Sequence, residues 1–498
     1  MVIYQLIFLT FLYLVGSLFM WSIFPQLKPI DKQLLSPFVG IGFSAIGVGA
    51  LLILQVSLSL ISFFVSLLII IIGIKLFFSK MVTSYFPSKL SIKDFVFNAI
   101  SIPFILYVII SLSFLKIGYG DASPDSTGFE GVGRYLEQGG VLKSNVHELP
   151  FILNGRLLIV GSMHAINRMF HGYNLYALNP TMCFWLLIFM SYTIFKMNKA
   201  LDISKRLSIL LFFLITLGLY KRYFSGMFDI HNNQLAMVYF TLAFLSLYLF
   251  SVLNDRVWIY IGSLTIAFAC LTRIDMLIGS LIYFFLLGVN DKVNYKILIS
   301  SYCIFIIVCL PWRIFTVYHT PWNTWYVNFP QISALLGANI ICCLIFVFAY
   351  RKQKFISSFK KLPIIGMPLV MVIVFLCYPD RFTLAWNLFF KYILLGHSTW
   401  LSIVASLLFS AAAFRYISHY DKDYYILFSP TVIYLFLLFL MVAVSGREGE
   451  DHSADRMVLH TVPLFVYSLF IGFSTAITHK PKPSRGVFGL HTKKLAQS

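Results

Sequence analysis

Charge is scarce in this sequence. Asp, Glu, Lys and Arg make up 11% of the 498 residues, whereas 59% of the residues are hydrophobic. Soluble domains usually contain about 25% charged residues. The shortage excludes a soluble globular protein and predicts an all-α, polytopic transmembrane helical bundle.

Acidic residues are scarcer than basic ones, with 19 Asp and Glu against 38 Lys and Arg. An excess of positive charge can indicate a nucleic-acid partner, but here the basic residues form short clusters behind apolar runs and no continuous basic face. Cytoplasmic loops of membrane proteins collect Lys and Arg. We therefore expect membrane lipids and no nucleic acid as partners.

Cysteine is also rare, with seven residues, and none lies in the longest polar segment. This distribution predicts neither a disulfide framework nor a zinc site. The first 24 residues contain no basic n-region and no small-residue cleavage site. They therefore predict a retained first span and no signal peptide.

Long apolar runs are what the sequence has in abundance. A hydrocarbon core of about 30 Å requires roughly 20 apolar residues per helix, and on that measure we expect about fifteen spans. The spans are predicted near 2–23, 37–55, 57–78, 98–116, 174–195, 207–220, 234–252, 257–271, 274–290, 297–312, 331–350, 363–378, 398–414, 424–444 and 457–478. The weak pair around 257–290 could instead be re-entrant.

This division places about two thirds of the Lys and Arg, but only about a third of the Asp and Glu, on one side of the membrane. The basic side is predicted to be cytoplasmic, in a cell inner or plasma membrane, with the N-terminus outside and the C-terminus inside. The chain is predicted to divide into a four-span N-terminal segment (1–116), an external loop (117–172), a transmembrane core (173–478) and a basic cytoplasmic tail (479–498). We expect the functional site on the external face.

The external loop contains carboxylates at its beginning. Asp121 and Asp125 flank Ser123-Pro124, and a short amphipathic helix is predicted to follow, with Val132 and Leu136 on its apolar side. Such a helix would lie in the headgroup layer. Either aspartate can be a capping or first-turn residue. The alternative is a general base that takes a proton from a hydroxyl group attacking a lipid-borne electrophile.

Arginines near the external ends of spans are the second group of candidate residues. A guanidinium group can bind a phosphate with two parallel hydrogen bonds, although a single arginine can also reach out to lipid phosphates. Arg273 and Asp275 lie inside a long apolar stretch and could pair with each other. The candidate phosphate ligands are Arg222, Arg273, Arg313, Arg381 and Arg456.

Polar residues at the predicted external start of one span, Asp229, His231 and Asn232, can cap the helix or bind sugar hydroxyls. Glu130, on the polar side of the predicted amphipathic helix, is a further candidate substrate-binding residue. His231 suggests a divalent cation, Mg²⁺ or Mn²⁺, shared with Asp121 or Asp125. The sequence has no paired ligand spacing to support one, and we predict no metal ligands and no certain cofactor.

Several short motifs, taken together, resemble the GT-C superfamily of polytopic glycosyltransferases. They are the order Asp121, Asp125, Phe129, Arg134-Tyr135-Leu136-Glu137 and Gly139-Gly140, then Leu178-Asn179-Pro180, Leu271-Thr272-Arg273, Pro311-Trp312-Arg313, and Arg456 before Pro463. The resemblance implies a GT-C-like fold, a sugar donor carried on polyprenyl phosphate, and a catalytic role for Asp125, with Asp121 as second choice. The first three spans have no counterpart in the common GT-C plan.

The functional prediction is therefore an inverting glycosyltransferase that modifies a cell-envelope glycan, lipid or protein on the external face. A glycan polymerase or ligase is an alternative, but its large external loop usually comes late in the chain. A lipid-linked sugar flippase or transporter is another alternative. It would need ionisable residues within spans, and apart from Asp275 these are scarce.

Overall fold

The computed structural model describes residues 2–81, 101–115, 124–138, 158–171, 175, 177–197, 202–219, 232–319, 329–349, 362–388, 424–445 and 459–478. Within these ranges the regular structure is helical, without a strand. The helices are α1 (Val2–Ile23), α2 (Pro29–Ile53), α3 (Leu60–Met81), α5 (Ile102–Leu115), α6 (Pro124–Glu137), α8 (Leu158–Met169), α9 (Leu178–Met197), α10 (Ile203–Leu219), α12 (Asn232–Leu253), α13 (Val257–Thr272), α14 (Met276–Gly288), α15 (Tyr295–His319), α16 (Phe329–Ala349), α18 (Leu362–Cys377), α19 (Pro379–Leu388), α21 (Tyr425–Ser445), the 3₁₀ turn η2 (Leu459–Thr461) and α23 (Val462–Thr478).

The helices confirm a multi-pass membrane protein. Five described helices are long and apolar enough to cross a bilayer, and they lie in α1, α2, α9, α12 and α15. A sixth crossing results if α18 and α19, which are bent by 119° at their junction, form one broken span. Seven shorter apolar helices have 10 to 17 residues. The number of about fifteen spans therefore stays a prediction, and the span expected near 398–414 lies outside the described residues.

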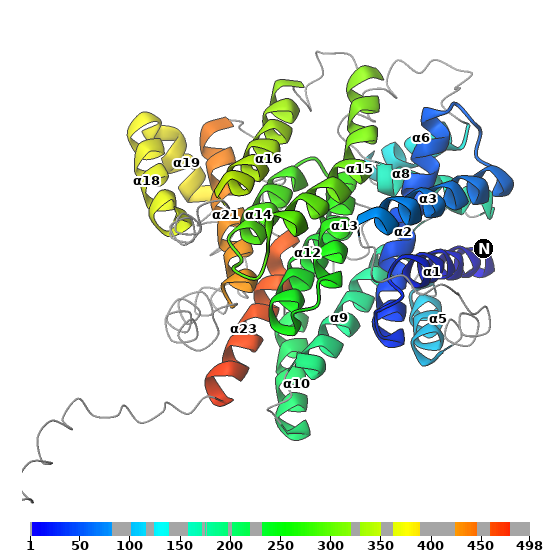
Figure 1. Cartoon of the computed structure of the whole chain (residues 1–498), viewed down its shortest axis with the longest axis horizontal. Helices are drawn as coiled ribbons and strands as arrows, with labels where there is room; N and C mark the ends of the chain where they lie inside the picture. Colours follow the sequence, from blue (N-terminus) through cyan, green and yellow to red (C-terminus); the bar gives the residue numbers. More distant parts are fainter. Residues whose placement is uncertain are drawn as a thin grey trace, which may run out of the picture.

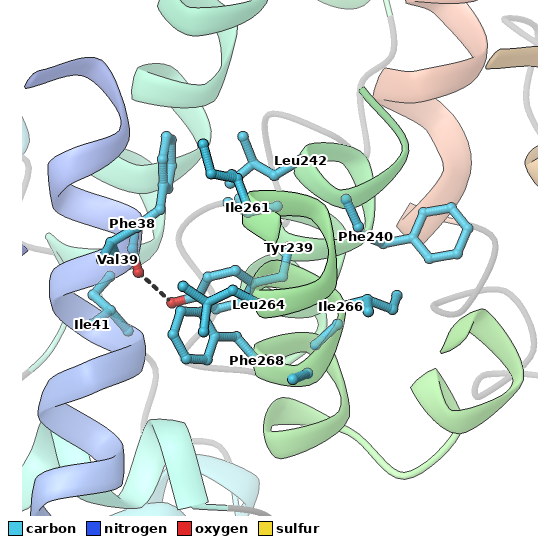
Figure 2. Packing of buried hydrophobic residues seen from close by; sticks show 14 of the residues in the cluster. Phe38, Val39, Ile41, Tyr239, Phe240, Leu242, Ile261, Leu264, Ile266 and Phe268 are labelled. Carbon is cyan, nitrogen blue, oxygen red and sulfur yellow. Dashed lines mark hydrogen bonds between the residues drawn. The ribbon is translucent and has the colours of Figure 1, made fainter. Parts of the chain in front are cut away.

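Helix α12 lies at the centre of the bundle. In Figure 1, α1, α2 and α8 lie to one side of α12 and α13, and α16, α18, α19 and α21 lie to the other. The Tyr239 hydroxyl of α12 donates a hydrogen bond of 2.9 Å to the Phe38 carbonyl of α2, and Phe268 of α13 packs beside it (Figure 2). A side chain at Gly42 would overlap the Phe268 ring. The core thus joins the N-terminal helices directly to the central pair.

Helix α2 begins earlier than its predicted span, at Pro29 instead of residue 37. Its first turn buries Asp31 and Lys32, which are 1% and 3% exposed. Lys196 of α9 neutralises Asp31 with two hydrogen bonds of 2.8 Å, while the Lys32 ammonium group donates to the Pro25 carbonyl. Buried charges persist in proteins when they are paired and hydrogen-bonded. The pairing therefore lets two charged residues enter the bundle.

Helices α13 and α14 form an antiparallel hairpin. The Tyr283 hydroxyl donates to the Ile259 carbonyl at 3.0 Å, and the Cys270 thiol donates to the Met276 carbonyl at 3.2 Å. Both helices are shorter than α12, and the three residues 273–275 make the turn between them. The predicted weak pair of spans is thus a helical hairpin.

The bundle has two chemically different ends. At one end, which we call the basic end, Lys196 lies 4.8 Å from the ring centroid of Trp258 at the start of α13, and Lys292 donates to the Ser251 carbonyl near the end of α12. Since α13 runs from Trp258 to Thr272, the turn 273–275 lies at the opposite end, which we call the Arg273 end. Lys196 and Lys292 thus share one end, as expected for residues on the predicted basic side.

Candidate functional site

An interruption of helical structure places Arg273 and Asp275 side by side. Arg273 has an extended backbone (φ −147°, ψ 145°), which ends α13, and Asp275 immediately precedes α14. The Arg273 Nε donates to Asp275 Oδ1 at 2.7 Å. The predicted ion pair is confirmed. A carboxylate at the start of α14 is also favoured by the positive end of the helix dipole.

A second helix holds the same guanidinium group. Arg273 Nη1 donates to Oδ1 of Asn233, the second residue of α12, at 2.5 Å. Asn233 is buried, whereas the Arg273 side chain retains 19% exposure. The guanidinium is thus fixed on two of its nitrogens by buried acceptors and still reaches the surface of the bundle.

Two further residues, Tyr434 and His460, complete the cluster, and neither was predicted from the sequence. The Tyr434 hydroxyl of α21 lies 3.1 Å from Asp275 Oδ2 and 3.0 Å from His460 Nδ1. His460 Nδ1 itself lies 3.6 Å from Asp275 Oδ2. Tyr434 and His460 are both fully buried or nearly so. We call these four residues with Asn233 the Arg273 cluster.

The sequence contained one weak signal for His460. It is a polar residue at the opening of the last apolar run, three positions before Pro463. Tyr434 carries no such signal, because tyrosine is common within apolar helices of this chain. Its role depends on Asp275, which lies 159 residues away.

Arg313 lies beneath the turn and inside the bundle. Its side chain is 1% exposed, and its Nη2 donates to the Cys270 carbonyl, three residues before Arg273. Arg313 thus fastens α15 to α13. This buried position does not by itself support the predicted role of Arg313 in phosphate binding.

Arg381 belongs to another part of the bundle. It lies on α19, with its guanidinium carbon 5.8 Å from the ring centroid of Tyr378. Val374 of α18, Ala385 of α19 and Phe439 of α21 belong to a small apolar cluster separate from the main core.

The other predicted residues are described only in part or not at all. Asp125 is the second residue of α6 and Asn232 the first residue of α12, and only their helical backbone is described. Asp121, Arg222, Asp229, His231 and Arg456 lie outside the described residues. Their assigned roles stay predictions.

The amphipathic helix predicted in the external loop is confirmed as α6. It begins at Pro124 and buries Val132 and Leu136, which are 0% and 1% exposed. These residues face α8, where a Cβ added at Gly161 would come within 2.4 Å of the Val132 side chain. The absence of a side chain at Gly161 therefore allows α6 and α8 to approach closely.

Ion pairs line the polar edge of this helix pair. Arg134 and Arg168 lie 2.8 Å and 3.7 Å from Glu130 Oε1, and Arg168 Nε donates to Glu137 Oε2 at 2.7 Å. Glu130, predicted as a substrate-binding residue, is thus a partner of two arginines. Exposed pairs of this kind contribute little to stability, typically below about 1 kcal/mol.

Helices α6 and α8 lie at the Arg273 end. Phe43 of α2 packs against Phe268 of α13, so α2 runs from the basic end in the same direction as α13. Near the end of α2, a Cβ at Gly49 would touch Leu158 of α8, and the Leu58 amide donates to the Glu137 carbonyl of α6. Helix α6, which carries Asp125, therefore lies at the same end of the bundle as the Arg273 cluster.

His164 of α8 is buried against α6 and should make this contact sensitive to acid. Burial lowers the pKa of His164 to about 4, with the charge of Glu130 opposing and that of Arg168 reinforcing the shift. Between pH 6.5 and 4 the unfolded chain binds more protons than the folded one. The folded state therefore loses about 3 kcal/mol as the pH falls through this window.

This loss can be measured by thermal unfolding of the detergent-solubilised protein between pH 7 and pH 4. His164→Leu removes the titrating group, and we expect its stability to fall less steeply with pH than that of the wild type. Equal slopes in the two proteins would contradict the assignment to His164.

The described residues contain no group of three or more His, Cys, Asp or Glu that could hold a metal ion. The divalent cation considered from the sequence thus depends on residues outside the described ranges. Comparison with protein-family models, with curated proteins and with solved structures finds no match for this chain.

Proposed function

We propose that this chain is an integral-membrane glycosyltransferase of GT-C type. In the proposed reaction a sugar moves from a polyprenyl-phosphate carrier to a glycan, lipid or protein acceptor at the external face. The observation that carries the proposal is a partly exposed arginine, Arg273, held by Asp275 and Asn233 at the same end of the bundle as α6. Asp125, the proposed base, is the second residue of α6.

The proposed step uses one base and one cation. The Asp125 carboxylate takes the proton of the acceptor hydroxyl as its oxygen bonds to the anomeric carbon of the sugar. The bond between that carbon and the phosphate oxygen breaks, and the leaving polyprenyl phosphate keeps the electron pair. Attack from the opposite face inverts the anomeric centre.

Arg273 suits the leaving group. Negative charge grows on the phosphate as the bond breaks, and a cation fixed before the reaction stabilises that charge without reorganising. Hydrogen bonds from two of its nitrogens to Asp275 and Asn233 hold the guanidinium plane in one orientation. The remaining candidate arginines, Arg222, Arg313, Arg381 and Arg456, are secondary candidates for binding the phosphate.

One observation favours a second candidate, a lipid-linked sugar flippase or transporter. Asp275, Tyr434 and His460 form a buried ionisable network between helices, and such networks mark translocation paths in membrane proteins. A transporter would move the intact sugar-carrying lipid across the bilayer. A glycosyltransferase would leave free polyprenyl phosphate.

The test is sugar transfer by the purified full-length chain in liposomes. Polyprenyl-phosphoryl hexoses with a ¹⁴C-labelled sugar serve as donors, and envelope glycan extract serves as acceptor. We expect labelled acceptor with equimolar release of polyprenyl phosphate. Movement of label across the bilayer without release would favour the transporter.

Asp125→Asn is expected to reduce the transfer rate roughly a hundredfold, because it removes the proposed general base. Asp121→Asn is the comparison for the second-choice base. Asp202→Asn, on an exposed carboxylate near Lys205 at the start of α10, is the matched control and should keep the wild-type rate. Unimpaired transfer by both Asp125→Asn and Asp121→Asn, in folded protein, would remove the proposed base.

A further inference from the structure

His460 has one ring nitrogen engaged and one without a partner. Its Nδ1 lies 3.0 Å from the Tyr434 hydroxyl, whereas Nε2, in a side chain with 0% exposure, has no hydrogen-bond partner among the described residues. The great majority of buried polar atoms in proteins are hydrogen-bonded, and each exception needs an explanation. His460 Nε2 is one of several such atoms in the described residues, and it lies within the Arg273 cluster.

The neighbouring hydrogen bonds determine which nitrogen carries the proton. Tyr434 has one hydroxyl hydrogen, and the Asp275 carboxylate can only accept. Tyr434 therefore donates to Asp275 Oδ2 at 3.1 Å, and its oxygen accepts from a proton on His460 Nδ1. In a neutral imidazole the other nitrogen then has a lone pair and no proton. Nε2 is thus a buried hydrogen-bond acceptor without a donor among the described residues.

We propose that His460 Nε2 accepts a hydrogen bond from a hydroxyl group of the sugar whose phosphate lies beside Arg273. This inference rests on the proposed function and adds the group that recognises the sugar.

The cluster has the composition that such a ligand requires. A sugar phosphate combines an anionic group with hydroxyl donors a few bonds away, and the cluster combines the Arg273 guanidinium with an acceptor nitrogen. Asp275 links the two parts of the cluster, because its Oδ1 accepts a hydrogen bond from Arg273 and its Oδ2 accepts one from Tyr434. Nε2 is closed to solvent here, so a hydroxyl group reaches it only when elements packed against η2 move apart.

The first test measures the tautomer and needs no ligand. In the full-length protein labelled with ¹⁵N-histidine, the His460 resonances are assigned by their loss in His460→Gln. We expect the Nδ1–H tautomer at neutral pH, and a change of tautomer in Tyr434→Phe. Tyr424→Phe removes another buried tyrosine hydroxyl, which donates to the Ser468 carbonyl of α23, and it should leave the signal unchanged. An Nε2–H tautomer in the wild type would overturn the inference.

The second test compares binding of farnesyl phosphate with binding of farnesyl-phosphoryl glucose, mannose and galactose. His460→Leu is expected to weaken at least one sugar-bearing probe about tenfold, the loss typical of one hydrogen bond. The affinity of this variant for farnesyl phosphate should stay within about twofold of that of the wild type. His460→Gln, whose amide oxygen can replace Nε2 as acceptor, is expected to restore part of the affinity.

Arg273→Gln separates this inference from the proposed function. This variant should bind all four probes more weakly, because all of them carry the phosphate. Suppose that Arg273→Gln weakens binding of the probes, but His460→Leu binds every sugar-bearing probe with wild-type affinity. Nε2 then has only an internal water as its partner, and the inference fails while the proposed function stands. If the wild type binds none of the probes, the proposed function fails and the inference with it.

Discussion

Asp275→Asn is expected to lower the free energy of unfolding by about 3–5 kcal/mol and to abolish sugar transfer. The carboxylate is 8% exposed and accepts from Arg273 and Tyr434. An amide in its place leaves the Arg273 charge partly buried without its counter-ion. Its NH₂ group would also face one of the two donors. The guanidinium then loses its fixed orientation as well as its partner.

Two comparisons make this prediction specific. Asp255→Asn removes a more exposed carboxylate at the basic end, where it accepts from the Val257 amide, and should cost less than about 1 kcal/mol. The double variant Arg273→Met, Asp275→Leu removes the charge together with its partner and should recover much of the stability without transfer activity. Chemical unfolding and the liposome assay measure the two effects. Wild-type stability in Asp275→Asn would contradict the burial of the pair.

Gly40→Ala is expected to destabilise the protein by at least about 3 kcal/mol. A Cβ at Gly40 would lie 1.8 Å from the Leu12 carbonyl oxygen, and one at Gly16 would lie 1.7 Å from the Ser36 oxygen. Both obstacles are backbone atoms, so no change of rotamer can relieve the overlap. Helices α1 and α2 must separate, and the buried Ser17–Ser36 hydrogen bond of 3.1 Å is lost.

Gly73→Ala provides the matched control. Gly73 lies in α3, another apolar helix, and a Cβ there meets nothing within 4 Å. Alanine is favoured over glycine inside helices by about 0.5–1 kcal/mol, so this variant should be neutral or slightly more stable. Thermal unfolding in detergent distinguishes the two. Similar melting temperatures for Gly40→Ala and Gly73→Ala would show that α1 and α2 can shift without loss.

The helices were predictable where local pattern determines them. Ser123-Pro124 and the apolar spacing of Val132 and Leu136 predicted α6, and the apolar run near 174–195 predicted α9, which begins at Leu178. The early start of α2 has a local signal that hydropathy alone misses, with Pro29 at the first helical position and Asp31 in the first turn. The burial of Asp31 was not predictable, because its partner Lys196 lies 165 residues away. Pairing over such separations is set by the order of helices in the bundle, which hydropathy does not encode.

The candidate site likewise has one part that local sequence pattern predicts and one part that it does not. Arg273 and Asp275 are two residues apart, and charge within an apolar stretch was enough to predict their pairing. Tyr434 and His460 join them through packing of α21 and η2 against the hairpin turn, so local pattern gave no signal for Tyr434 and only a weak one for His460. Arg313 shows the opposite case. Its position near a helix end suggested an external role, but the side chain turns into the bundle toward the Cys270 carbonyl.

The bond between Asp31 and Lys196 also bears on how the chain is made. At a synthesis rate of about 5–20 residues per second, the 165 residues between them require about 10–30 s. Throughout that interval the Asp31 carboxylate lacks its counter-ion, and burial of an unpaired charge is costly. We therefore expect the amino-terminal hairpin to settle fully into the bundle only after helix α9 is made, and nascent chains halted before it to be targets of membrane proteases.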